Sequence, residues 1–107
     1  MIVVTASGVA GFRVSATLGM VRGSSVRARH LGSDIAAHLR NIAGGEVKEY
    51  TKMLAEAREQ AIDRMVEEAQ ALDADAVVTV RFQTSEVMHG AAEMLCYGTA
   101  VKLEVDE

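Results

Sequence analysis

Side chains able to bind a metal ion or act as a nucleophile lie close together in sequence near the C-terminal end of this chain. Within nine positions of the stretch EVMHGAAEMLCYGTAV (86–101) lie Met88, His89, Met94 and Cys96, and Cys96 is the one cysteine of the sequence. Thiolate and thioether groups are the ligands that soft ions such as Cu(I) prefer, and imidazole also binds copper. The stretch therefore supports two hypotheses, a soft-metal site or the end of an apolar hairpin.

Distance along a strand separates these candidate ligands. If the chain turns near Gly90, His89 lies at the tip of a hairpin, and Cys96 lies on the return strand more than roughly 10 Å away, at about 3.3 Å per residue. His89 and Cys96 then cannot share one ion within a chain. Met94 and Cys96 project from one face of the strand, at positions i and i+2, so they are the predicted metal ligands.

Two sulfur atoms alone make a poor site, because a structural metal site takes three or four ligands. An oligomer axis that gathered this face from several chains would supply a ring of thiols. The alternative is that Met94 and Cys96 are compact apolar side chains packed at a subunit contact. A nucleophilic Cys96 is not expected, since the sequence places no histidine or cation to lower the thiol pKa.

The elements that must position these residues follow from hydrophobic periodicity. Alternation over 12–29 predicts a long strand with a bulge near 23–25, and IVVTA (2–6) predicts a short strand before it. Its apolar residues are expected to share one face of the strand and its polar residues the other, the apolar set being Val14, Ala16, Leu18 and Met20.

Two helices are predicted. SDIAAHLRNIAGG (33–45) has a capping Ser33 and terminal glycines, with His38 in a structural role. Residues 47–72 have the period of a long amphipathic helix, whose charged face is expected to be solvated rather than catalytic. Its apolar stripe consists of Tyr50, Leu54, Ala57, Ala61, Met65, Ala69 and Leu72.

DADAVVTVRFQTSEV (73–87) and EMLCYGTAVKLEV (93–105) are expected to pair as an antiparallel hairpin around MHGAA. On the first strand, one side is expected to hold Ala76, Val78, Val80 and Phe82. The second strand is apolar or small on both faces. Since one helix layer covers one face of a sheet, the other cover is expected to be a second subunit.

The composition limits the function classes. The 107 residues make one domain (1–107) with four aromatic side chains, no tryptophan and a net charge of −4. This net charge argues against a nucleic-acid partner. Residues 1–45 carry +4 and the remainder −8; a basic patch for phosphate or RNA is one interpretation, and head-to-tail contact between copies is the favoured one. A lone cysteine, no leader and no long apolar run predict a cytoplasmic protein with no membrane partner.

Several segments together resemble the YbjQ-like family over nearly the whole chain: residues 18–45, 50–82 and GTAVKL (98–103). The most specific pieces are Gly19, LRNIAGG, the spacing of residues 50, 54, 58 and 61, ADAVV and GTAV. The chain departs from the family pattern at Glu46, where an arginine is usual, and at Asp73, where glycine is usual.

The resemblance implies an α+β subunit with an antiparallel sheet and one short and one long helix on one face. Such a dodecin-like subunit assembles into a ring, typically a homopentamer. The family carries a heavy-metal-binding label, and no set of ligand residues comes with it.

The expectation is thus a non-enzymatic, ring-forming homo-oligomer that binds a soft or heavy metal, or another thiophilic ligand, through Cys96 and Met94. No other cofactor is expected. The alternative is a small-molecule-binding or scaffolding oligomer that uses clefts between subunits, where the scarcity of aromatic residues argues against stacking a flavin.

Overall fold

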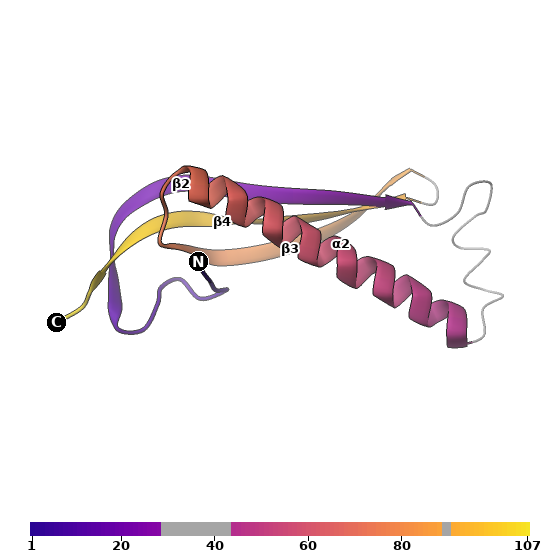
Figure 1. The fold of residues 1–107 in the computed structure, drawn as a ribbon, viewed down its shortest axis with the longest axis horizontal. Coiled ribbons are helices and arrows are strands. Elements are labelled where there is room, and N and C mark those ends of the chain that lie inside the picture. Colours follow the sequence, from indigo (N-terminus) through magenta and orange to yellow (C-terminus); the bar gives the residue numbers. More distant parts are fainter. Residues whose placement is uncertain (29–43, 89–90) are drawn as a thin grey trace.

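Residues 1–28, 44–88 and 91–107 are described by a computed structural model of the chain. They form a four-stranded sheet with a long helix across one face (Figure 1). This confirms the α+β class. The short helix expected over 33–45, with His38, lies outside the described residues up to residue 43. The elements are β1 (Ile2–Val3), β2 (Phe12–Ala28), α2 (Gly44–Ala71), β3 (Ala76–Met88) and β4 (Ala91–Val105).

The sheet has the strand order β1-β3-β4-β2. β3 and β4 form the predicted antiparallel hairpin, and β2 is antiparallel to β4. β1 instead runs parallel to β3, so the expectation of a purely antiparallel sheet is wrong. The parallel pairing arises because the N-terminal segment follows the outer edge of β3 in the same direction, held by bonds such as Val4 N to Val77 O at 3.0 Å.

The helix confirms the middle of the predicted stripe, whereas Leu72 lies beyond its end and is 44% exposed. Small side chains at Ala57, Ala61 and Ala69 flank Met65, and all four are buried. Their three- and four-residue spacing keeps them on the side of α2 that faces β2 and β4. The helix lies close to the strand because Gly23 of β2 offers no side chain at the crossing. The charged residues predicted on the other face of α2 are exposed.

The expectation that the apolar residues of β2 share one face is wrong, because the pairing of β2 with β4 shifts register at two places. The first shift, between Val14 and Ala16, puts these two residues on opposite faces. The second lies between Thr17 and Gly19, and Gly19 has φ +126°, a conformation that glycine adopts readily. After the second shift Val21 is fully buried, whereas Met20 is 66% exposed. The bulge expected near 23–25 is absent, since pairing with β4 is continuous from Gly19 to Ala28.

A second change of face occurs in β3. Thr79 has φ 56° and lies where the register with β4 shifts. Before it, Ala76 and Val78 pack with Val101 in a small cluster under the N-terminal segment. After it, Val80 packs against the helix side. The expectation that Ala76, Val78, Val80 and Phe82 share one side is therefore wrong.

The turn from α2 into β3 depends on two aspartates. Asp73 adopts φ 60°, so an aspartate holds a left-handed position of the kind that glycine most often occupies after a helix. The Asp75 carboxylate accepts a hydrogen bond from the Leu103 N–H at 2.8 Å and pairs with Lys102 at 3.4 Å. The backbone hydrogen bond, aided by Lys102, holds the pKa of Asp75 below its ordinary value.

The subunit is elongated, with principal extents of 58 × 23 × 15 Å. Its radius of gyration is 17.4 Å, whereas a compact domain of this length has about 13 Å. The sheet face opposite α2 keeps large apolar side chains in water, including Met20 and Val26. Within the described ranges, no helix has the length and apolar character needed to cross a membrane.

Candidate soft-ligand site and the groove on helix α2

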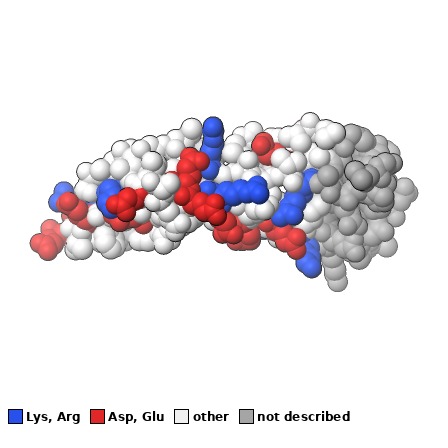
Figure 2. All heavy atoms as spheres, turned by 45° about the horizontal axis from the view of Figure 1, so that its top comes forward, with Lys and Arg blue, Asp and Glu red and all other residues white. Residues whose placement is uncertain are grey.

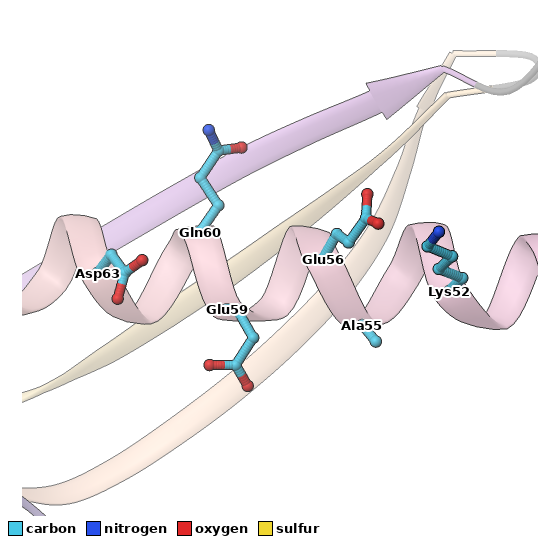
Figure 3. Close-up of a pocket in the computed structure, with 6 residues that line it drawn as sticks. All are labelled: Lys52, Ala55, Glu56, Glu59, Gln60 and Asp63. Atoms are coloured by element: carbon cyan, nitrogen blue, oxygen red, sulfur yellow. The ribbon is translucent and has the colours of Figure 1, made fainter.

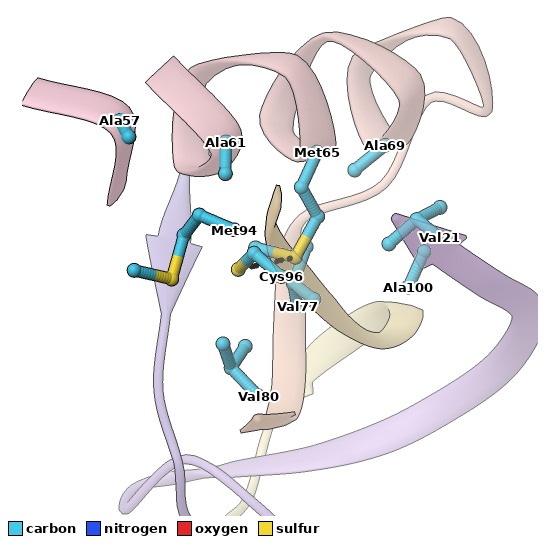
Figure 4. Packing of buried hydrophobic residues seen from close by; sticks show 10 residues of the cluster. All are labelled: Val21, Ala57, Ala61, Met65, Ala69, Val77, Val80, Met94, Cys96 and Ala100. Carbon is cyan, nitrogen blue, oxygen red and sulfur yellow. Dashed lines mark hydrogen bonds between the residues drawn. The ribbon is translucent and has the colours of Figure 1, made fainter. Parts of the chain in front are cut away.

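The thiol of Cys96 lies in the core between α2 and the sheet. Cys96 is fully buried on the face of β4 that α2 covers. Its Sγ donates a hydrogen bond to Sδ of Met65, from the middle of α2, at 3.4 Å (Figure 4). We call these two atoms the sulfur pair. Two soft donors from different elements thus meet in an apolar environment.

Met94 lies on the same face of β4 as Cys96. It is 7% exposed and belongs to the same buried cluster, so the prediction that the two side chains share a face is confirmed. The Met94 Sδ, however, accepts a hydrogen bond from Thr84 Oγ1 of β3 at 3.3 Å. Sequence reasoning missed Met65, although its central place in the stripe of α2 was a usable signal. Metal binding by Cys96 and Met94 stays a prediction.

The core keeps the thiol protonated. Burial raises the pKa of Cys96 above its ordinary value. An ion that binds the thiolate must displace that proton, so binding should strengthen as pH rises. No group of three or more His, Cys, Asp or Glu side chains able to hold a metal occurs in the described parts of the chain, and His89 lies outside them. The sulfur pair fits a soft ion of low coordination number, not a four-ligand zinc site.

A polar contact joins α2 to β2 beside this core. Ser25, which is 1% exposed, donates its hydroxyl hydrogen to Gln60 Oε1 at 2.7 Å. Arg27 Nη2 donates to the same oxygen at 3.0 Å. The Arg27 Nε is buried and has no hydrogen-bond partner among the described residues. Gln60 is therefore held in one orientation, at the border between the core and the surface of α2.

A shallow, open groove of about 550 Å³ lies along the exposed side of α2, with Gln60 at one edge (Figure 3). The described residues that line it all come from α2. Its acidic side chains Glu56, Glu59 and Asp63 are exposed, and we call them the acidic flank. Lys52 adds one positive charge at one end. The remaining lining residues are Ala55 and Gln60.

Comparison with known proteins adds a family and a fold. A family model described as "Putative heavy-metal-binding" matches residues 1–104. A protein named UPF0145 protein from Methanosarcina acetivorans is 60% identical over 103 residues, covering 96% of this chain and 97% of that protein. A UPF0145 protein from Thermus thermophilus is 57% identical, covering 97% and 91%.

A solved structure has the same fold. The crystal structure of a protein of unknown function from Pediococcus pentosaceus, assigned to the DUF74 family, superposes with a TM-score of 0.67. The alignment covers 97% of this chain and 98% of that chain at 17% sequence identity. At that identity the likeness extends to the arrangement of helices and strands and not to the residues of a site.

Proposed function

The chain belongs to the YbjQ family, and from this premise we propose that it is a non-enzymatic homo-oligomeric binding protein. Its subunits assemble through the sheet face that α2 leaves open. The observation that supports assembly is the shape of the subunit. A radius of gyration of 17.4 Å, against about 13 Å for a compact domain, leaves a small core and much exposed apolar surface.

The open sheet face is the part of this surface that we expect a partner to bury. Met20 is 66% and Val26 58% exposed, although both lie on the longest strand of the sheet. Large apolar patches on a protein surface mark contacts with other molecules. In a cyclic assembly, a second copy of the chain covers this sheet face. The resemblance to ring-forming proteins favours five copies.

Native mass spectrometry of the untagged chain tests this proposal. We expect a single species of fixed subunit number, five if the ring closes as the resemblance implies. Dilution should yield monomers without intermediate sizes, because closed rings gain their last contact cooperatively. A chain that remains monomeric at every concentration would contradict the proposal.

A soft metal ion is the candidate ligand, because the contact between Cys96 and Met65 brings two sulfur atoms together. The sulfur pair holds one thiol and one thioether 3.4 Å apart. With the thiol deprotonated, such donors select Cu(I) and similar ions. Met94 is the adjacent third sulfur residue of the same cluster. A bound ion would link α2 to β4, and Cys96 would have to release its proton.

Titration with Ag(I), a redox-stable stand-in for Cu(I), tests this candidate. We expect one ion per subunit in native mass spectra. Cys96→Ala should abolish binding, and Met65→Leu should weaken it at least about tenfold by removing one ligand. Met88→Leu is the matched control, since Met88 is 66% exposed and distant from the cluster by its place at the end of β3. Equal binding by Cys96→Ala and wild type would contradict the candidate.

A further inference from the structure

The open face of the sheet carries an apolar patch on β2 and β4 with Arg22 at its centre. Arg81 and Glu93 border the patch, in register with Tyr97 and Val26. On β2, Met20, Arg22 and Val26 point away from α2, because they alternate with the buried residues at 21, 23 and 25. Arg22 pairs in register with Tyr97 of β4, whose side chain is half-buried on the same face. We call Met20, Arg22, Val26 and Tyr97, together with Leu95, the sheet patch.

Arg22 stands apart from the other described arginines of the sheet. Arg13 pairs with Glu104, and Arg81 donates to the Thr5 carbonyl at 3.0 Å. Arg27 is held by Gln60. Arg22 is exposed and makes no hydrogen bond or ion pair with any residue in the described ranges. Its charge is thus available to a partner.

The acidic flank of α2 has the opposite character. Glu56, Glu59 and Asp63 follow each other at three- and four-residue steps, so they lie along one side of the helix. With Lys52 the groove carries a net charge of −2 from three carboxylates and one ammonium. In Figure 2 acidic and basic side chains occupy the middle of the visible face, beside a large uncharged area.

We propose that the sheet patch of one copy docks on the acidic flank of the next copy, with Arg22 in the groove beside Glu59. This inference rests on the proposed homo-oligomer and names its two contact surfaces. The surfaces match in length: Met20 to Val26 spans about 20 Å at 3.3 Å per strand residue, and Lys52 to Asp63 spans about 17 Å at 1.5 Å per helix residue. Met20 and Val26 would cover the aliphatic floor of the groove at Ala55.

The charges favour this head-to-tail contact over packing of the sheet patch on itself. A two-fold contact would bring Arg22 of both copies, and Arg81 beside the patch, into one interface. Each copy would then contribute two arginines against one half-buried carboxylate on this face, Glu93. Like charges brought together in this way oppose association. The head-to-tail contact leaves one patch and one flank free on each dimer, so it adds further copies until a ring closes.

Charge reversal tests the contact. Arg22→Glu and Glu59→Arg should each raise the subunit concentration at half-assembly at least about tenfold, since each places like charges in the interface. The double variant restores an opposite pair and should return to within about threefold of wild type. Arg58→Glu and Glu68→Arg are matched controls, because both residues are exposed and lie outside the two surfaces. Light scattering coupled to gel filtration over a dilution series measures assembly.

Circular dichroism and urea unfolding would establish that each variant folds. Single variants that assemble like wild type, or a double variant no better than the weaker single, would overturn the inference and leave the homo-oligomer standing. A wild-type chain that is monomeric throughout would overturn both. Stronger assembly of Arg22→Glu would indicate that the sheet patch packs on itself and would equally overturn the head-to-tail contact.

Discussion

The crossing of α2 over β2 depends on the missing side chain of Gly23, and Gly23→Ala is the substitution that tests it most sharply. A methyl group at this position would lie 2.1 Å from the backbone oxygen of Ala61 and 2.4 Å from the backbone nitrogen of Met65. Both are backbone atoms, so no side-chain rotation can relieve the overlap. The helix itself must move.

The magnitude follows from the size of this movement. Contacts of a Cβ below 3.0 Å essentially never occur, so α2 must retreat by about 0.9 Å from Gly23. Overpacking of a core costs about 1–3 kcal/mol, occasionally more. Alanine returns about 0.4–1 kcal/mol by restricting the unfolded chain. Because rigid backbone is displaced, we expect the upper part of the range and a net loss of about 2 kcal/mol in the free energy of unfolding.

Urea unfolding at a fixed subunit concentration measures this loss, since oligomerisation makes apparent stability depend on concentration. The midpoint should fall by about 1 M for a chain of this size. Gly8→Ala is the matched control, because no atom lies within 4 Å of the added methyl, and its stability should stay within about 0.5 kcal/mol of wild type. Equal stability of Gly23→Ala and wild type would refute the close crossing.

Three further predictions concern individual side chains. The native state of the wild type should lose stability as pH rises above 9.0, because burial raises the pKa of the Cys96 thiol and the unfolded chain releases that proton first. Urea midpoints across the alkaline range should show less of this loss in Cys96→Ala. Asp75, whose pKa is lowered by a backbone N–H of β4, should stabilise the fold above pH 3.8 and cease to do so as pH falls below that value, so acid unfolding of Asp75→Asn should depend less on pH. Gln60→Leu leaves the buried Ser25 hydroxyl without its acceptor and should lower the free energy of unfolding by about 1–3 kcal/mol, measured by urea unfolding.

Much of the fold was predictable because its strongest signals are local. The three- and four-residue spacing of alanines around Met65 predicted the buried face of α2, and the alternation on both sides of residues 88–92 predicted the β3–β4 hairpin. The faces of β2 and β3 were not predictable from alternation. In β2 the register shifts between Val14 and Ala16 and again near Gly19, and in β3 it shifts at Thr79. Each shift moves the following residues to the opposite face, and a period-two sequence pattern does not reveal it.

The face that Cys96 and Met94 share was predictable from the sequence, whereas the contact of Cys96 with Met65 was not. Cys96 and Met94 were identified because they lie two residues apart on one strand, which is a local relation. Met65 was missed because it is 31 residues away from Cys96, and contact between them depends on where α2 crosses the sheet. That crossing is set by Gly23 and the small residues of the helix, a relation that emerges only when both elements are placed in space.

The position of Cys96 also decides how assembly and ion binding can be related. Cys96 faces α2, whereas its neighbour Tyr97 faces the open side of the sheet, because successive residues of a strand point in opposite directions. Assembly through the open face would therefore keep the thiols of different copies apart, each behind its own sheet, and would not build the ring of thiols that the sequence allows. A soft ion would then bind to the sulfur pair of a single subunit, in proportion to subunits. Monomers obtained by Arg22→Glu should bind Ag(I) as well as the oligomer does.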